Sequence, residues 1–275
     1  MSEIDFSKPL TPWQIVQVAR TAGRPLIADY IEGMCDDFVE LHGDRAFGDD
    51  RGMIGGFATI GGQRVMLIGH QKGKNVEDNI KANFGMANPE GYRKVMRLMK
   101  LAEKYNLPVV SLVDTPGAYP GLEAEARGQA EAIAKNLVVM AALRTPFIIV
   151  VTGEGGSGGA LGIAVGDTVM MLQYAVYSVI SPEGCASILW RDGKKAPEAA
   201  EAMKITADSL LKLGIIDEVL PEPPQAAHSD PSAMVKTVKA AVVRRVKELK
   251  ALSTDELISR RYAKLRNMGS TILGK

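Results

Sequence analysis

The chain of 275 residues is 46% hydrophobic and carries a formal net charge of +1 at pH 7. Its length allows one sizeable domain with a large core, and its near-neutral charge gives no global reason to expect nucleic acid as a partner. No segment reaches the ~18 consecutive apolar residues of a membrane span, so we expect no membrane partner.

The first residues, MSEIDFSKPLTPW, have acids and prolines where a signal peptide needs a basic start and an apolar run, so we expect a cytoplasmic protein. An amphipathic helix is expected around Leu26 to Leu41, followed by the glycine- and aspartate-rich turn HGDRAFGDDRG. The segment GGFATIGGQRVMLIGHQ indicates two strands joined at Gly61 and Gly62, a dipeptide suited to the positive φ of a tight turn.

From residue 89 onward, helical and strand patterns alternate. We expect helices over PEGYRKVMRLMKLAEKY and EAEARGQAEAIAKNLVVMAAL, and apolar strands over PVVSLVD and PFIIVVTG. The segment SGGALGIAVG starts a further helix. Strands without polar alternation are covered on both faces, so the pattern predicts an α/β core with parallel crossovers.

The last third adds shorter elements. TVMMLQYAVYSVISPEG indicates one or two strands, GCASILW begins a helix, TADSLLKLG is a helix closed by Gly214, and IIDEVLPEP is a strand. PEPPQAAHSDPSA is expected to be a linker. It leads to two C-terminal helices, the second of which is capped by Ser253 or Thr254.

Two glycine-rich turns follow apolar strands. In VVSLVDTPGAYPG, residues 109–121, the apolar run ends in the Asp-Thr-Pro-Gly of a GTPase magnesium loop, and GEGGSGGA, residues 153–160, matches G-x-G-x-x-G. A GTPase also needs the G-x-x-x-x-G-K-[S/T] loop, which occurs nowhere in the chain. A dinucleotide site needs an acid at the end of the next strand, ~20 residues further on, and that stretch, MMLQYAVYSVIS, holds no acid until Glu183. The motifs therefore do not favour a nucleotide site.

Conventional catalytic side chains are scarce. Ser157 lies in a G-x-S-x-G pattern, but the only histidine after it, His228, lies in the linker, a poor place to orient an imidazole. His42 and His70 are more often structural or surface residues than metal ligands. The cysteines, Cys35 and Cys185, match no Cys-x-x-Cys spacing, so we expect no metal site.

What remains is a pair of turns, each between a buried strand and a helix. Glycine permits close backbone approach and positive φ, and N–H groups at the start of a helix point toward negative charge. Each turn alone could serve packing only, but together they favour a site that binds an oxyanion.

Several long motifs occur in order and cover nearly the whole chain. They resemble the carboxyltransferase α-subunit family of multisubunit bacterial acetyl-CoA carboxylase. The matching segments include DTPGAYPG, GEGGSGGALGI, MLQYAVYSVISPEGCASILW, HGDRAFGDD, GHQKG and STDELISRRYAKL. The resemblance implies a crotonase-like α/β fold of ββα units wound into a spiral. It also implies one carboxyltransferase domain over 1–275, with a core over about 45–222 and helical extensions over 1–44 and 232–275.

The implied reaction transfers a carboxyl group from carboxybiotin, on a separate biotin carboxyl carrier protein, to acetyl-CoA and gives malonyl-CoA for fatty acid synthesis. The implied partners are a homologous β subunit in an α2β2 heterotetramer, the carrier protein and biotin carboxylase. No cofactor is expected to stay bound to this chain. The four-cysteine zinc ribbon of many β subunits is absent from the sequence, which supports α identity.

The resemblance also assigns roles to residues. The backbone amides of Gly158, Gly159, Gly117 and Ala118 are candidate donors to a developing oxyanion. We expect Gly159→Val to abolish transfer and to leave the fold and partner binding largely intact. The expected reason is that a branched side chain would intrude on the ligand and resist positive φ.

A basic cluster lies near these turns in sequence and comprises Lys72, Lys74, Lys81 and Arg93. We predict substrate binding by Lys72, Lys74 and Arg93, to CoA phosphates or to the carboxylate of carboxybiotin, although such residues are usually solvated. Two other functions stay open at this point: a crotonase-type hydratase or decarboxylase that needs no partner, and a nonenzymatic nucleotide-binding module.

Overall fold

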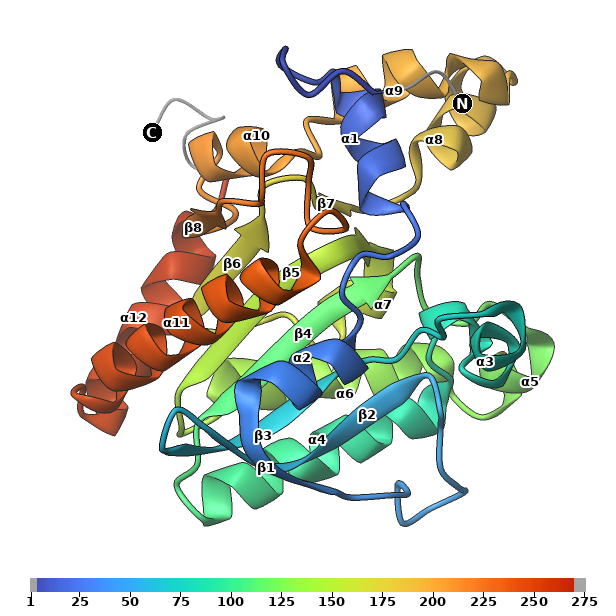
Figure 1. Ribbon diagram of the computed structural model, residues 1–275. Helices are drawn as coiled ribbons and strands as arrows, with labels where there is room; N and C mark the ends of the chain where they lie inside the picture. Colours follow the sequence, from blue (N-terminus) through green and yellow to red (C-terminus); the bar gives the residue numbers. More distant parts are fainter. Residues whose placement is uncertain (1–3, 270–275) are drawn as a thin grey trace.

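The computed structural model describes residues 4–269, and in this part of the chain eight strands form one sheet with helices on both faces (Figure 1). The strands are β1 (Cys35–Glu40), β2 (Met53–Ile60), β3 (Gln63–His70), β4 (Val109–Thr115), β5 (Phe147–Gly156), β6 (Thr168–Leu172), β7 (Val176–Ser178) and β8 (Glu218–Leu220). Their order across the sheet is β1-β2-β3-β4-β5-β6-β8, and β7 pairs with β5 off this path.

The sheet has an antiparallel and a parallel part. β1, β2 and β3 are antiparallel neighbours, and β2 and β3 form the expected hairpin, in which Gly61 and Gly62 have φ values of +55° and +75°. From β3 through β6 to β8 all neighbours are parallel, and β7 runs parallel to the end of β5. The carboxyl ends of the parallel strands therefore meet at one edge of the sheet.

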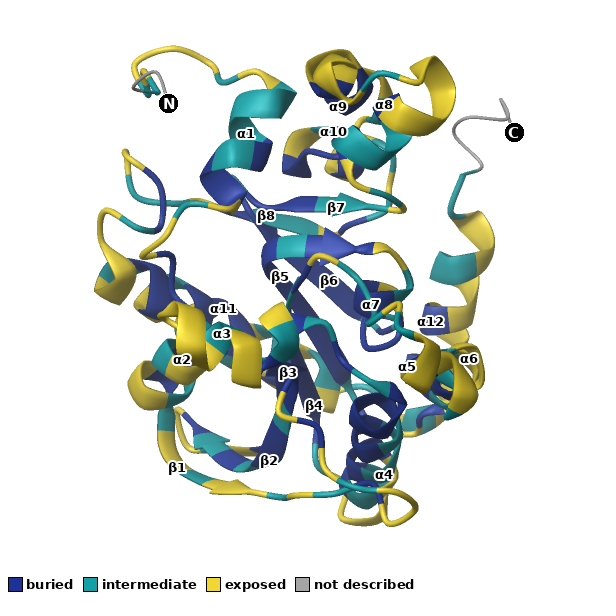
Figure 2. Ribbon diagram, turned by 90° about the vertical axis from the view of Figure 1, so that its right-hand side faces the viewer, coloured by how far each residue is buried: buried dark blue, intermediate teal, exposed yellow. Residues whose placement is uncertain are grey.

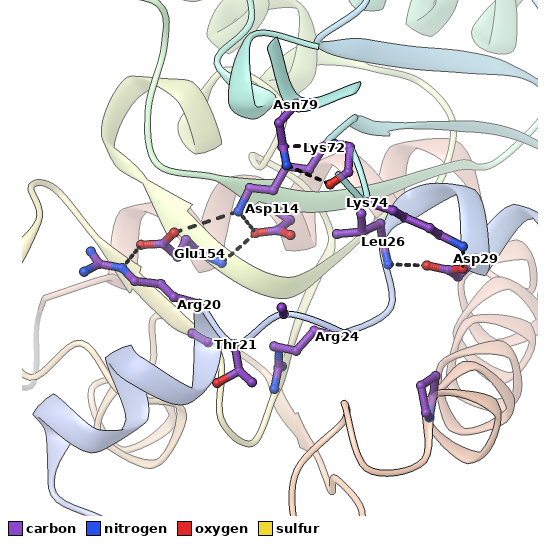
Figure 3. Close-up of a pocket in the computed structure, with 15 residues that line it drawn as sticks. Arg20, Thr21, Arg24, Leu26, Asp29, Lys72, Lys74, Asn79, Asp114 and Glu154 are labelled. Atoms are coloured by element: carbon purple, nitrogen blue, oxygen red, sulfur yellow. Dashed lines mark hydrogen bonds and ion pairs between the residues drawn. The ribbon is translucent and has the colours of Figure 1, made fainter. Parts of the chain in front are cut away.

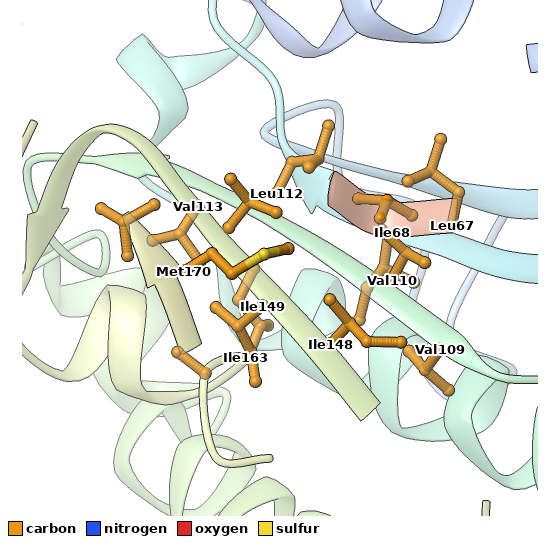
Figure 4. Close-up of a cluster of buried hydrophobic side chains, with 14 of the residues drawn as sticks. Leu67, Ile68, Val109, Val110, Leu112, Val113, Ile148, Ile149, Ile163 and Met170 are labelled. Carbon is orange, nitrogen blue, oxygen red and sulfur yellow. The ribbon is translucent and has the colours of Figure 1, made fainter. Parts of the chain in front are cut away.

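The parallel strands form the centre of the hydrophobic core. Val109, Val110, Ile148 and Ile149 of β4 and β5 are completely buried. Figure 4 shows these side chains between the strands and the segments that cover them. Helices cover both faces of these strands, which explains their continuously apolar sequence, and burying each such side chain contributes ~1.5–3 kcal/mol.

Helices cover both faces of the sheet and its carboxyl edge. They are α1 (Pro12–Ala19), α2 (Ile27–Met34), α3 (Val76–Lys81), α4 (Pro89–Lys104), α5 (Leu122–Ala126), α6 (Gln129–Ala142), α7 (Ser157–Leu161), α8 (Pro182–Trp190), α9 (Ala196–Met203), α10 (Ala207–Lys212), α11 (Pro231–Lys250) and α12 (Thr254–Asn267). Figures 1 and 2 show α2 and α11 on one face and α4 and α6 on the other. α1, α8 and α9 lie together beyond the carboxyl ends of the strands.

Two of the helix predictions are wrong in part. The helix expected over 26–41 ends at Met34, because the residues that follow pair with β2 as the edge strand β1, and tertiary pairing overrides local periodicity. The helix expected over the segment that starts at Glu123 is broken between α5 and α6. Gly128 separates the two helices with φ of +83°, a conformation that glycine adopts without steric cost.

The expected linker and C-terminal helices pack closely on the rest of the chain. Ala226 and Ala227 of the linker are completely buried, and α11 packs against α2. α12 starts with the Ser253 side chain accepting a hydrogen bond from the Glu256 N–H, one of the two caps expected. Among residues 4–269 no helix is long and apolar enough to cross a membrane.

Candidate active site

The two glycine-rich turns start side by side at the carboxyl edge of the sheet. β4 ends at Thr115 and β5 ends at Gly156, and Thr115 pairs with Gly155 in parallel register. The first turn runs over 116–118, and the second is the start of α7. The four candidate backbone donors therefore follow two neighbouring strand ends.

Gly159 contacts the first turn directly. A Cβ atom at Gly159 would lie 2.4 Å from the carbonyl carbon of Gly117 and 2.5 Å from the nitrogen of Ala118. The φ of Gly159 is not positive, so the torsional reason expected for the damage by Gly159→Val is wrong. Glycine is required at this position because the backbone of the other turn occupies the space of a side chain.

The N–H groups of the two turns differ in their availability. The Gly117 N–H donates to Thr115 Oγ1 at 3.1 Å, and the same hydroxyl donates to the Gly117 carbonyl oxygen at 2.8 Å. Gly158 and Gly159 lie in the first turn of α7, where N–H groups have no acceptor within the helix. Gly117 is therefore the weakest of the four candidate donors, since its N–H is already satisfied.

A chain of charged side chains lies directly before the two turns. Lys72 Nζ lies 2.6 Å from Asp114 Oδ1 and 3.8 Å from Glu154 Oε2, and Arg20 Nε lies 2.7 Å from Glu154 Oε1. Figure 3 shows the Lys72 ammonium between the two carboxylates. Asp114 Oδ1 also accepts the Glu154 N–H at 3.0 Å, so one carboxylate links the ends of β4 and β5.

These charged residues border a cavity of 530 Å³ at the carboxyl edge. Both Lys72 and Lys74 line this cavity, and their binding of a substrate stays a prediction. The Lys74 side chain is 63% exposed and lies 2.5 Å from Asp29, whereas Lys72 is largely buried in its carboxylate pairs. The structure therefore brings these two lysines together at the edge that carries the turns.

Arg93 and Lys81 do not join them in this cavity. Arg93 Nε lies 2.7 Å from Asp44 Oδ2, and Arg93 Nη1 donates to the carbonyl oxygen of Arg127 at 2.9 Å. Arg93 thus ties α4 to the aspartate-rich loop and to the break between α5 and α6. Lys81 pairs with Glu77 one helical turn away on the exposed helix α3.

Ser157 enters α7 with φ of +50°, a conformation that non-glycine residues rarely adopt. Its side chain is exposed, and within residues 4–269 no hydrogen bond joins it to a histidine. His228 lies beside Phe6, with 6.5 Å between the ring centroids. The structure therefore offers Ser157 no oriented base of the kind that a serine hydrolase needs.

His70 at the end of β3 is a buried residue whose contacts the sequence did not reveal. Its residue exposure is 2%, and neither ring nitrogen has a hydrogen-bond partner in the part of the chain that the structure describes. The ring lies against the Gly159 backbone and near Asp114 and Lys72. Burial is the main cause that lowers the pKa of His70 to about 4, and the charge of Lys72 acts in the same direction. The imidazole is therefore neutral at pH 7.

No sequence motif indicates that Arg20, Asp114 and Glu154 belong to one network of ion pairs. Arg20 follows α1, and its Nη1 lies 2.5 Å from Glu183 Oε1 at the start of α8. The residues of this network come from five separate segments that only the tertiary structure brings together. Only the position of Asp114 and Glu154, the acids of DTPGAYPG and GEGGSGGA, could have indicated a role.

Comparison with known proteins gives a consistent result over the whole chain. The family model described as acetyl co-enzyme A carboxylase carboxyltransferase-like matches residues 2–269. A protein of Geobacter metallireducens named acetyl-coenzyme A carboxylase carboxyl transferase subunit alpha is 57% identical over 268 residues, which cover 98% of this chain and 84% of the relative. A protein of the same name from Stenotrophomonas maltophilia is 55% identical over 270 residues, which cover 98% of this chain and 85% of the relative.

Solved structures share the fold at low sequence identity. A transcarboxylase 12S chain matches with a TM-score of 0.68 and 21% identity, over 90% of this chain and 46% of that chain. A chain of a Pseudomonas malonate decarboxylase hetero-tetramer in complex with coenzyme A matches with a TM-score of 0.67 and 16% identity, over 89% of this chain and 95% of that chain. These matches confirm the expected crotonase-like fold.

Proposed function

The chain belongs to the acetyl-CoA carboxylase carboxyltransferase-like family, and we propose that it acts as the α subunit of such a carboxyltransferase. In this function the enzyme moves a carboxyl group from carboxybiotin, on a separate biotin carboxyl carrier protein, to acetyl-CoA, and malonyl-CoA forms. The observation that carries the proposal is the contact of the two glycine turns at Gly159, which gathers backbone N–H groups at one sheet edge.

The reaction develops negative charge on two oxygens. Removing a proton from the acetyl methyl group places charge on the thioester oxygen, and releasing the carboxyl group places charge on the ureido oxygen of biotin. Preorganised N–H donors stabilise such charge more strongly than they stabilise the neutral reactants. The amides of Gly158, Gly159 and Ala118 suit one of these oxygens, and we assign them to the biotin side. Gly117 then contributes mainly by the shape of its turn.

A homologous β subunit would supply the second half of the site. Among the described residues no side chain beside the turns is free to act as a base. Ser157 has no histidine partner, and His70 is buried with its pKa lowered to about 4. The carboxylates of Asp114 and Glu154 are paired with Lys72 and Arg20. The β subunit, in an α2β2 heterotetramer, would supply most of the acetyl-CoA side. The carrier protein would bring biotin from biotin carboxylase, so this chain need hold no cofactor permanently.

Lys72 and Lys74 are the candidates for contact with an anionic group of a substrate. Both line the cavity that Asp114 and Glu154 border at the carboxyl edge of the sheet, and Lys74 is the more accessible of the two. Lys72 is better suited to hold the strand ends through Asp114, because it is paired at 2.6 Å. Substrate binding by Arg93 stays a sequence prediction, because the Arg93 guanidinium is paired with Asp44.

Gly159→Ala tests the proposal in the complex with a β subunit. The added Cβ must push the turn over 116–118 away, because it would lie 2.4 Å from the Gly117 carbonyl carbon. A displacement of about 1 Å can reduce a rate by about 100-fold, so we expect at least that loss in kcat for biocytin-dependent breakdown of malonyl-CoA.

Gly48→Ala is the matched control. Its φ is not positive, and a Cβ there would meet no atom within 4 Å, so we expect wild-type kcat. Gly158→Ala keeps its N–H and would meet only Ile133, at 3.6 Å or more, so its loss should be smaller than that of Gly159→Ala. A Gly159→Ala complex as active as the Gly48→Ala complex would contradict the assignment of the turns.

A further inference from the structure

The five-residue helix α7 has a buried carboxyl end that its own backbone does not satisfy. The Gly162 N–H bonds the carbonyl oxygen of Gly158, and the Ile163 N–H bonds that of Ala160. The chain then turns away, which leaves the carbonyl oxygens of Gly159, Gly162 and Ile163 without a continuing helix. Buried carbonyl groups need donors, so other parts of the molecule must supply them.

Three completely buried side chains supply these donors. The Tyr92 hydroxyl of α4 donates to the Gly159 oxygen at 3.4 Å, and Asn136 Nδ2 of α6 donates to the Gly162 oxygen at 3.0 Å. The Ser111 hydroxyl of β4 donates to the Ile163 oxygen at 2.8 Å. We call Tyr92, Ser111 and Asn136 the α7 cradle.

Two members of the α7 cradle, Tyr92 and Asn136, are also joined to each other. Asn136 Nδ2 donates to the Tyr92 carbonyl oxygen at 3.0 Å, so one amide group joins α4 to the end of α7. The Tyr92 ring packs against Gly162, where a Cβ would lie 2.8 Å from a ring carbon. The cradle is therefore a connected set of contacts between a helix pair, a central strand and α7.

We propose that Tyr92, Ser111 and Asn136 are positioning residues for carboxyl transfer, which fix α7 so that the Gly158 and Gly159 N–H groups keep their direction. This inference rests on the proposed function. A helix of five residues is too short to be stable alone, and α7 is entered through Ser157 at φ of +50°. The direction of its first N–H groups thus depends on what holds its other end.

A positioning role predicts a particular kinetic pattern. Donors aimed at an oxygen that becomes negative only during the reaction act in the transition state, so misaligned donors lower kcat and change KM little. A merely structural role would instead lower the melting temperature and the fraction of folded enzyme, while each folded molecule would keep its kcat.

Tyr92→Phe in the assembled complex is the principal test, because it removes one oxygen and keeps the ring against Gly162. We expect kcat for biocytin-dependent breakdown of malonyl-CoA to fall about tenfold or more, with both KM values within about twofold of wild type. Tyr105→Phe is the matched control at the other end of the same helix. Tyr105 is 56% exposed and packs against Phe57, so wild-type kcat is expected.

Ser111→Ala provides a second test from β4, and we expect the same loss in kcat at unchanged KM. Wild-type kcat in folded Tyr92→Phe and Ser111→Ala complexes would overturn the inference, as would a loss that tracks the unfolded fraction. An inactive wild-type complex would instead contradict the proposed function itself, so the two failures are distinguishable.

Discussion

Gly153, Gly156 and Gly159 of GEGGSGGA each lie against a different residue of the segment 114–117. A Cβ would lie 2.4 Å from Asp114 Oδ1 at Gly153, 2.1 Å from the Pro116 oxygen at Gly156, and 2.4 Å from the Gly117 carbonyl carbon at Gly159. The three-residue spacing of these glycines is therefore explained by close contact with residues 114–117, at the end of β4 and directly after it. None of the three has a positive φ, so backbone proximity rather than torsional freedom explains the motif.

His70 makes a testable contribution to stability. Its pKa is about 4 in the folded chain and near 6.5 when unfolded, so below pH 6.5 the unfolded chain takes up a proton that the folded chain does not. Stability is thus lost as pH falls from 6.5 toward 4. Between pH 7 and pH 5 we expect the free energy of unfolding to fall by about 2 kcal/mol through this group. Urea unfolding at the two pH values measures the change.

The variants His70→Gln and His42→Gln separate this effect from general acid sensitivity. The first removes the buried imidazole, so the loss between pH 7 and pH 5 should shrink by about 2 kcal/mol. The second removes a histidine whose side chain is 63% exposed and should leave the loss in place. An equal pH dependence in both variants would show that His70 does not titrate as described.

At the scale of elements, some helices and strands could be predicted from local sequence signals, whereas others depend on tertiary contacts. The β2–β3 hairpin, α4 and the buried strands β4 and β5 followed from glycine turns, Pro89 and apolar runs. The start of α1 carries another local signal, a capping box of Thr11 with Gln14. The edge strand β1 could not be predicted locally, because pairing with β2 decides its conformation.

The C-terminal helix α12 is fixed by one completely buried arginine. Arg261 donates to both carboxylate oxygens of Asp167 at 2.8 Å, and also to the carbonyl oxygens of Met140, Leu143 and Thr145. Arg261→Met would leave a buried carboxylate and three carbonyl groups without these donors. We expect the free energy of unfolding to fall by about 3–5 kcal/mol, measured by urea unfolding.

Arg260 is the matched control on the same helix. Its side chain is 65% exposed and, within residues 4–269, pairs only with Glu256 one turn earlier, so Arg260→Met should change stability by less than about 0.5 kcal/mol. Similar small losses in the two variants would mean that α12 contributes little to the stability of the fold.

At the scale of the whole molecule, the carboxyl edge of the sheet combines segments from distant parts of the chain. The N-terminal segment crosses this edge, where Arg24 pairs with Glu222 at 2.8 Å and donates to the Thr152 carbonyl oxygen at 3.0 Å. The glycine turns were recognisable from their motifs, but their contact at Gly159 and the α7 cradle depend on pairs such as Tyr92 with Gly159. Such contacts are set by packing and have no local sequence signal.

The most direct test of the account is biocytin-dependent breakdown of malonyl-CoA, measured with this chain alone, with a β subunit alone and with the two mixed. Because one set of backbone donors is assigned to this chain and the rest of the site to the partner, we expect turnover only in the mixture. No turnover in a folded, confirmed complex would contradict the carboxyltransferase function. Full turnover by this chain alone would contradict the shared site.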